Sequence, residues 1–434
     1  MLGLGDEIEV IVEKPAAGGR MLARLEGRII LVHGAIPGER IRARVTKVER
    51  QLAFASTSEV LDASPDRRPT FTDLACGGCS YAHINYPRQL QLKAEVIKDA
   101  FARQGHIHLE APLDVKESPE RGYRMRARFH VRDGRIGFYR EGSHELCDPR
   151  TTGQLLDETV AAVSAAVNAV LASAPVAGAE VTENLSAVQR VLCLESSGGA
   201  EIPLTALETA VQAGGLTGCS AHSGTRSNVA GVPVVTDALE ALTKGRAGAG
   251  QLERHAESFF QANRFLLPDL VTSVLSSVLP DGSITELYAG VGLFSISLAH
   301  TGRERITAVE GDRASARDLM ANASTCGASV RVIVGSVEEY LSSNRARTGT
   351  MIVDPPRTGI SRKAIEAILR SRPERVVYVS CDPPTMARDA ARLVSSGYGL
   401  TALQAFDLFP NTPHVEALGV FDRTGAGGSD KPVE

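Results

Sequence analysis

The sequence predicts a mixed α/β protein built from a small N-terminal β-barrel, a central α+β domain and a C-terminal doubly wound domain. Short β-rich runs separated by glycine turns fill residues 1–58. Strands and short helices rich in Ala, Gly and Ser follow in residues 113–253, and regular strand–helix alternation begins near Ser258. A chain of 434 residues is too long for one ordinary core, which agrees with two or three domains.

Composition and charge set the broad class. Hydrophobic content of 43% and charged content of 23% are typical of a soluble globular protein. Seven unevenly spaced cysteines do not resemble a secreted disulfide scaffold, and neither a signal peptide nor a membrane-spanning run is visible. We therefore expect a cytoplasmic protein with no membrane partner, and nothing demands more than a monomer. A net charge of −4 does not indicate a nucleic-acid-binding protein, so any argument for nucleic-acid binding depends on local clusters of positive charge.

Local positive charge gathers in the N-terminal part. The β-rich runs at 7–12, 21–25, 28–32 and 40–45 are spaced as in a small barrel of the oligonucleotide-binding type. Basic residues outnumber acidic ones between Arg20 and Arg50. In a later predicted strand, Arg126 and Arg128 alternate on one face. Such arginines can bind phosphates, although a solvated strand face has about equal weight.

The remaining domain boundaries are indicated by a linker, a turn and a predicted helix along the chain. A linker begins near Leu61, a small-residue turn holds Cys76 and Cys79, and an amphipathic helix is predicted over residues 87–104. We assign residues 59–84 and 113–253 to the central domain. Residues 85–112 and 254–422 go to the C-terminal domain, and residues 423–434 are expected to be a disordered tail.

Three reactive side chains follow predicted strands of the C-terminal domain. Cys381 and Asp354 each come directly after a β-rich apolar run, and Glu416 lies in a proline-flanked loop after another. The carboxyl ends of parallel strands form one rim of an open sheet, so these side chains can converge there. A thiolate nucleophile, a polar anchor and a base would then share one site.

A glycine loop marks the expected cofactor side. A predicted strand containing Glu286 ends at Gly290 and Gly292 and runs into a helix, and Glu310 ends the next strand. Glycines there let a ligand approach the backbone, and an acid at this spacing commonly meets a ribose. Only two of the three dinucleotide-fingerprint glycines are present. The set favours a Rossmann-like site for S-adenosylmethionine over one for NAD.

With these residues in view, the chain resembles the RNA uracil-5-methyltransferase family. The motifs that carry the resemblance are Gly34–Arg40, FFQAN at 259–263, the glycine loop 286–294, DPPR at 354–357, SCDP at 380–383 and HVE at 414–416. The resemblance implies a TRAM barrel at residues 1–58 and S-adenosylmethionine as cofactor. It also implies a target base near Phe259, the methionine end of the cofactor at Gln261, and Tyr288 and Asp354 among the cofactor-binding residues.

The sequence departs from the family pattern at two places. Many members hold a [4Fe–4S] cluster on four cysteines; Cys76 and Cys79 match the second and third, but Thr70 occupies the first position. Cys147 lies near the expected fourth, so at most three thiols are available and we expect the cluster to be lost. Zinc binding, transient pairing or burial of Cys76 and Cys79 remain alternatives. Asp382 stands where asparagine is common, which could raise the pKa of Cys381.

The expected chemistry is methylation of uracil C5. Cys381 would add to C6 and make C5 nucleophilic, and Glu416 would remove the C5 proton. Asp354 would accept the uracil N3–H, and Arg357 could support an oxygen of the ring or a phosphate. His414 is expected to position the site rather than to catalyse. Cys193, Cys219 and Cys326 are expected to be core thiols.

Several functions compete on the sequence alone. The barrel favours 23S rRNA over tRNA as the substrate, which leaves the individual uridine open. A small-molecule methyltransferase would need no cysteine. A catalytically decayed RNA-binding protein would bind RNA without the cofactor, which the intact Gly290, Gly292 and Glu310 oppose.

Overall fold

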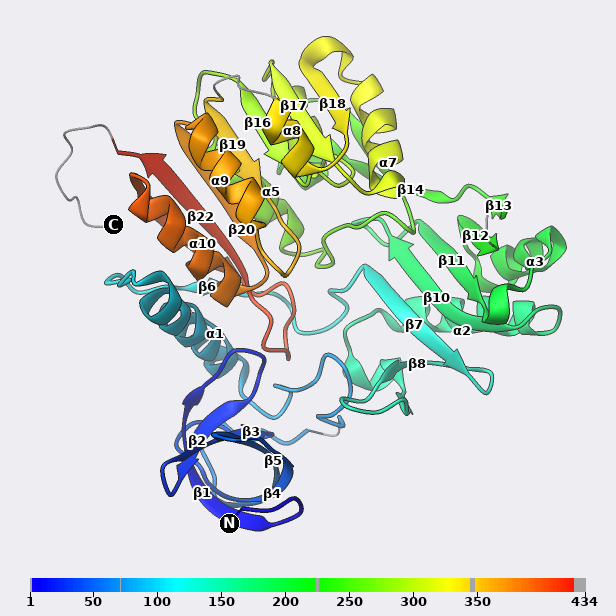
Figure 1. Ribbon diagram of the computed structural model, residues 1–434. Coiled ribbons are helices and arrows are strands. Elements are labelled where there is room, and N and C mark those ends of the chain that lie inside the picture. Colours follow the sequence, from blue (N-terminus) through cyan, green and yellow to red (C-terminus); the bar gives the residue numbers. More distant parts are fainter. Residues whose placement is uncertain (1, 71, 224–225, 344–347, 425–434) are drawn as a thin grey trace.

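The computed structural model describes residues 2–70, 72–223, 226–343 and 348–424, and these form a barrel, a central sheet and a C-terminal sheet (Figure 1). None of the helices in these ranges combines the length and apolar character that a membrane crossing needs. The predicted α/β class with its three parts is confirmed.

The N-terminal barrel is closed, with strand order β1-β2-β3-β5-β4. Its strands are β1 (Glu7–Pro15), β2 (Met21–Leu25), β3 (Arg28–His33), β4 (Arg40–Val48) and β5 (Leu52–Asp62). The sequence patterns did not predict β5, because its inward residues Ala53 and Ala55 are small and its centre is rich in Ser and Thr. β5 carries the barrel to Asp62, beyond the expected boundary at residue 58.

Three arginines of β4 lie on the outer face of the barrel and pair with carboxylates of neighbouring strands. The pairs are Arg40 with Glu9 and Asp62, Arg42 with Glu59, and Arg44 with Glu7. Exposed ion pairs contribute little to stability and are weakened by salt. A phosphate can therefore replace the carboxylate partner, but the face is less positive than the local count of basic residues indicates.

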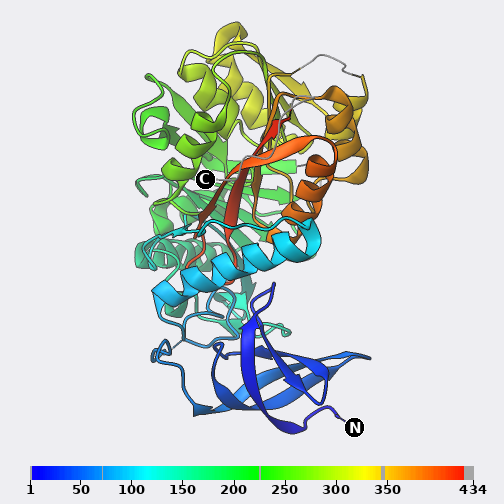
Figure 2. The same ribbon diagram turned by 90° about the vertical axis from the view of Figure 1, so that its left-hand side faces the viewer.

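Helix α1 (Tyr86–Ala100), extended by a π-helical turn at Phe101–Gly105, lies between the barrel and the C-terminal sheet (Figure 2). The predicted helix at 87–104 is thus confirmed. Lys93 on α1 forms a fully buried ion pair with Asp407 and donates a hydrogen bond to the Phe409 carbonyl at 3.1 Å. A buried charge needs such partners, so the pair fixes the loop after residue 406 to the helix.

The central domain is a seven-stranded sheet with order β13-β12-β11-β10-β7-β8-β9. Its strands are β7 (Arg126–Arg132), β8 (Arg135–Tyr139), β9 (Leu146–Cys147), β10 (Val176–Glu183), β11 (Arg190–Ser196), β12 (Gly218–Ser223) and β13 (Arg226–Gly231). Helices α2 (Asp157–Leu171) and α3 (Leu204–Gly214) pack on one face through an apolar cluster. We call the opposite face, which carries Arg126, Arg128 and Cys193, the open face.

The C-terminal domain is an eight-stranded sheet with order β18-β17-β16-β19-β20-β22-β21-β6, in which only β22 runs antiparallel to its neighbours. Its strands are β6 (Val115–Lys116), β16 (Ile284–Leu287), β17 (Ile306–Glu310), β18 (Val330–Val334), β19 (Thr350–Val353), β20 (Arg375–Ser380), β21 (Tyr398–Phe406) and β22 (Glu416–Arg423). One face carries α5 (Leu267–Ser277), α6 (Leu293–His300) and α7 (Arg313–Ser324). The other carries α1, α8 (Val337–Ser343), α9 (Arg362–Ser371) and α10 (Pro383–Ser395).

The structure corrects three further boundaries, in addition to that of the barrel. Residues 113–116 belong to the C-terminal sheet rather than the central domain, because β6 pairs with β21. The second correction concerns the end of the central domain, expected at residue 253. The hairpin of β14 (Val234–Ala238) and β15 (Gln251–His255), with the short helix α4 (Leu239–Leu242) between them, packs its leucines in one apolar cluster with α5 and α6 of the C-terminal domain. Arg423, expected in the tail, is the last residue of β22, and residues 425–434 lie outside the described ranges.

Gly292, at the start of α6, is a glycine whose substitution we expect to be costly. It has a φ of 92°, and a Cβ there would lie 2.7 Å from Ile296 Cγ1 and from Leu319 Cδ1. We expect Gly292→Ala to lower the free energy of unfolding by about 1–3 kcal/mol more than Gly302→Ala, because the added methyl overpacks the site. Gly302 is the matched control, with a φ of 87° and no atom within 4 Å of its Cβ position. Urea unfolding of both variants checks this, and equal losses would show that only the backbone conformation matters.

Candidate active site

The three strand-end residues of the expected site meet at one edge of the C-terminal sheet. Cys381 follows β20, and Glu416 is the first residue of β22. Ser380 pairs with Ala417 in the antiparallel ladder, so Cys381 and Glu416 occupy the next opposed positions. Asp354 follows β19, which lies beside β20. Cys381 and Asp354 therefore follow strands as expected, whereas Glu416, expected in a loop, begins strand β22.

Burial and mutual repulsion shape the acid–base properties of this group. Burial raises the pKa of Asp354 to about 7, and a hydrogen bond from Gln261 Nε2 at 3.2 Å opposes that rise. Burial and the nearby charge of Asp354 hold the pKa of Glu416 well above its usual range. Two carboxyls so placed favour the form in which one of them holds a proton.

The Cys381 thiol is held in its neutral form. Burial raises its pKa to about 12, and the charges of Glu416 and Asp354 push in the same direction. Arg357 opposes them through its charge and a hydrogen bond. The structure therefore places a neutral thiol beside a cation that favours its thiolate form and beside a carboxyl that can carry a proton.

Asp382 has a local structural role beside Cys381. It is the N-cap of α10, and its side chain accepts a hydrogen bond from the Thr385 N–H at 2.9 Å. Capping by a carboxylate also suits the positive end of the helix dipole. The largest acidic contributions to the Cys381 pKa come from Glu416 and Asp354 rather than from Asp382.

The expected cofactor residues lie along the same edge, around the start of α6. Glu310 accepts hydrogen bonds from the Gly290 N–H at 2.7 Å and the Asp312 N–H at 2.6 Å. Glu286 is buried, accepts from the Ser295 N–H at 2.8 Å, and has a pKa raised to about 8, mainly by burial. Through these hydrogen bonds the two carboxyls fix the backbone of the glycine loop and of the first turn of α6. The Gln261–Asp354 bond links this side to the catalytic side.

Backbone conformation in the glycine loop is unusual even outside its glycines. Tyr288 has a φ of 62°, ahead of Gly290 at 56° and Gly292 at 92°. A non-glycine residue in the left-handed region is strained and often marks a functional turn. Tyr288 is half-buried among side chains of the α8–α10 face.

The aromatic pair before Gln261 has one buried and one exposed ring. Phe260 is buried, with the Arg254 guanidinium 3.8 Å from its ring centroid. Phe259 is 60% exposed, and the Arg126 guanidinium lies 5.6 Å from its centroid. Arg126 and Arg128 each pair with a carboxylate of the open face, Glu180 and Glu195 respectively. Phe259 therefore presents a ring to solvent beside this open face.

The cysteine loop does not supply a four-cysteine donor set. Cys76 is disulfide-bonded to Cys147, with their Cα atoms 6.0 Å apart. Cys79 is a buried free thiol whose pKa burial raises to about 12, and Thr70 stands at the remaining position. Three thiols do not fit a [4Fe–4S] cluster of the usual kind. Loss of the cluster stays a prediction, and no step of the chemistry below uses one.

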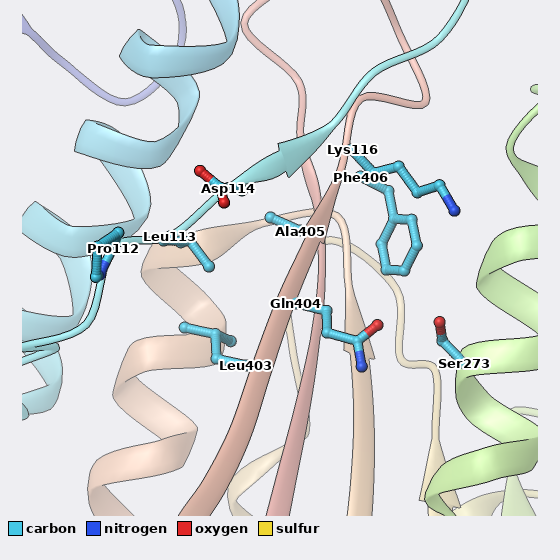
Figure 3. A pocket seen from close by; sticks show the side chains of 9 residues that line it. All are labelled: Pro112, Leu113, Asp114, Lys116, Ser273, Leu403, Gln404, Ala405 and Phe406. Atoms are coloured by element: carbon cyan, nitrogen blue, oxygen red, sulfur yellow. The ribbon is translucent and has the colours of Figure 1, made fainter. Parts of the chain in front are cut away.

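A separate pocket of about 290 Å³ lies at the β6–β21 edge of the sheet, lined by Leu113, Ser273 and Gln404 among others (Figure 3). None of the predicted site residues lines it. We therefore assign it no part in the chemistry.

Comparison with known proteins identifies the family. The profile of the tRNA (Uracil-5-)-methyltransferase family matches residues 249–424, and that of the TRAM domain matches residues 3–57. An uncharacterised RNA methyltransferase of Thermosynechococcus vestitus is 32% identical, across 96% of this chain and 98% of its own length. The chain belongs to the RNA uracil-5-methyltransferase family.

Other relatives agree with this placement. An uncharacterised RNA methyltransferase of Streptomyces coelicolor is 31% identical to this methyltransferase, across 98% of this chain and 94% of its own length. The solved Pyrococcus abyssi tRNA (uracil-54, C5)-methyltransferase, in complex with S-adenosyl-L-homocysteine, matches with a TM-score of 0.74 at 23% identity. That match covers 95% of this chain and 99% of the other, and it confirms the fold.

Sequence reasoning missed residues that hold the methyltransferase site together. Buried Asp389 accepts hydrogen bonds from the Ile360 N–H and the Tyr378 hydroxyl, each at 3.0 Å, and so ties the DPPR loop to α10. Asn263 donates to the Leu408 carbonyl at 3.1 Å and fixes the loop before Glu416. Asn263 lies inside the FFQAN motif, which was the available signal for it, whereas Asp389 lies on α10 six residues after the SCDP motif. Among the three expected core thiols, Cys219 is buried, whereas Cys193 and Cys326 are only half-buried.

Proposed function

We propose that this protein transfers a methyl group from S-adenosylmethionine to C5 of a uridine in RNA. The observation that carries the proposal is the juxtaposition of Cys381 and Glu416 on adjacent strands, with Asp354 and Arg357 beside them. A simple methyl transfer to nitrogen or oxygen needs no thiol at this place. Activation of C5 does, because a poor carbon nucleophile must first be made electron-rich.

The residues present fit the cofactor. Gly290, Gly292, Glu310 and Gln261 lie along one edge of the sheet, and S-adenosylmethionine would supply the methyl group there. Glu310 would exchange a backbone partner for ribose hydroxyls, and Gln261, now bonded to Asp354, would face the methionine end. Tyr288 and Glu286 would act by shaping the loop.

Each catalytic side chain then has one task. The Cys381 thiol loses its proton to solvent, and the resulting thiolate sulfur bonds to C6 of uracil, which moves an electron pair onto the ring and makes C5 nucleophilic. After C5 has taken the methyl group, Glu416 removes the C5 proton and the sulfur–C6 bond breaks, returning the thiolate. Asp354 accepts the N3–H and rejects cytosine, which lacks that proton. Phe259 offers a stacking face for an extruded base.

Activity should rise with pH through about 7. Asp354 must be ionised to accept the N3–H, and its raised pKa keeps it protonated below about 7. The raised pKa values of Glu416 and Cys381 act in the same direction, because a base and a thiolate are both deprotonated forms. We expect kcat/KM for RNA to increase from about pH 6 to about pH 9 without a falling limb. A profile that falls across this range would contradict the assignment of Asp354 and Glu416.

We propose 23S rRNA as the substrate, with tRNA as the alternative. The experiment is methyl transfer from labelled S-adenosylmethionine to unmodified 23S rRNA and unmodified tRNA in separate reactions. Label recovered as 5-methyluridine from 23S rRNA supports the whole proposal, and label from tRNA alone corrects the substrate. RNA binding without cofactor binding would favour a decayed enzyme, and label in small molecules only would favour the small-molecule alternative.

A further inference from the structure

Three side chains with metal-binding atoms converge on the open face of the central sheet. Cys193 lies on β11, His222 on the adjacent β12, and Glu257 in the segment after β15. The Cys193 sulfur is 3.7 Å from Glu257 Oε1, and His222 Nε2 forms an ion pair with the same oxygen. All three ligand atoms lie within 4.8 Å of one another. The three residues come from separate segments of the chain, so no short sequence motif predicts that they lie together.

The strand register explains why two of them share a face. Cys193 pairs with Ser220 in the parallel ladder, and His222, two residues further along β12, therefore points to the same side. The other side of this sheet is filled by α2 and α3. Glu257 completes the group from the segment that leads directly to Phe259.

The donor set has the composition of a zinc site. Zinc takes thiolate sulfur at about 2.3 Å and imidazole nitrogen or carboxylate oxygen at about 2.0–2.2 Å in tetrahedral geometry, which separates sulfur from oxygen by about 3.5 Å. The 3.7 Å between Cys193 and Glu257 is close to that separation. Oxygen-preferring magnesium and calcium do not select a cysteine, whereas zinc does.

Neighbouring groups support such a site. Arg317 lies 3.8 Å from Glu257 Oε2, which leaves Oε1 directed at Cys193 and His222. An outer partner of this kind orients a ligating carboxylate. The His222 side chain is 44% exposed, so an ion can enter from solvent and a water can occupy the fourth position.

We propose that Cys193, His222 and Glu257 bind one zinc ion that fastens the central sheet to the segment carrying Phe259. Binding would release the proton of the Cys193 thiol and replace the His222–Glu257 ion pair by two metal bonds. Glu257 lies two residues before Phe259, whose ring contacts Arg126 on the same face. The ion would thereby hold the stacking residue in place. This proposal does not depend on which RNA is methylated.

Zinc content and affinity of the full-length protein test the proposal. After removal of metal with a chelator and reloading, we expect one zinc per chain by elemental analysis, with affinity measured against a chromophoric chelator. Cys193→Ser and His222→Ala should each lower the affinity at least about tenfold, a loss seen even when only a supporting contact of a metal site is removed. Cobalt loading should give a thiolate-to-metal charge-transfer band that Cys193→Ser abolishes.

Matched variants separate this site from other thiols. Cys326→Ser removes a half-buried free thiol elsewhere, and Cys79→Ser alters the cysteine loop, so both should keep wild-type zinc affinity. His222 is exposed, so His222→Ala should fold as the parent does, and thermal unfolding without zinc checks this. Zinc affinity unchanged in both Cys193→Ser and His222→Ala, or no zinc binding by the wild type, would overturn the proposal.

Discussion

Cys381→Ala is expected to abolish 5-methyluridine formation, lowering kcat by at least about 10⁴-fold, as loss of a covalent nucleophile commonly does. Without the sulfur no bond to C6 can form, and C5 remains a poor nucleophile. Binding of S-adenosylmethionine should survive, because Gly290 and Gly292 lie in the loop after β16 and Glu310 at the end of β17, away from Cys381 in the chain. Single-turnover transfer of labelled methyl groups to RNA measures the loss.

The control for this variant is Cys326→Ala, which removes another half-buried thiol. It should keep full activity, whereas a loss equal to that of Cys381→Ala would indicate nonspecific damage. Calorimetric titration with the cofactor shows whether Cys381→Ala is still folded at the site. If Cys381→Ala retained more than about a tenth of wild-type kcat, the covalent mechanism would be wrong and direct transfer would be favoured.

Glu416→Gln is expected to trap the enzyme on its RNA. Glutamine has the shape of glutamate but cannot accept the C5 proton, so attack and methyl transfer can proceed while release of the sulfur cannot. We expect turnover to fall by about 10²–10⁴-fold, the usual contribution of a general base. A methylated protein–RNA adduct that survives denaturing electrophoresis should accumulate.

The adduct has its own controls. The double variant Cys381→Ala/Glu416→Gln should form none, because the sulfur that makes the bond is gone. Glu366→Gln changes an exposed carboxyl on α9 and should behave as the wild type does. Normal turnover in Glu416→Gln would refute the assignment of the base, and loss of turnover without any adduct would place Glu416 before the methyl transfer rather than after it.

The predicted and observed positions agree most closely for reactive residues that lie in short motifs at strand ends. Cys381, Asp354 and Gly292 were predictable because parallel strands bring their carboxyl ends to one edge whatever the surrounding packing.

Features that depend on distant segments were not predictable. The barrel arginines meet acids such as Glu7 and Glu59, which lie outside the stretch in which positive charge was counted. The charge of a strand face depends on which strands become its neighbours, and that pairing is set by the whole barrel. The bond between Cys76 and Cys147 spans 71 residues, so its formation likewise depends on the folded loop.

The buried pair of Lys93 and Asp407 has a consequence for biosynthesis. The two residues are 314 positions apart, so a ribosome adding about 5–20 residues per second makes Asp407 about 15–60 s after Lys93. During that interval α1 has neither its counter-ion nor the sheet that β6 joins through β21. The barrel, whose strands all lie within the first 62 residues, can close long before. The enzyme is thus assembled from its N-terminal end, and its catalytic domain is completed only when the final two strands leave the ribosome.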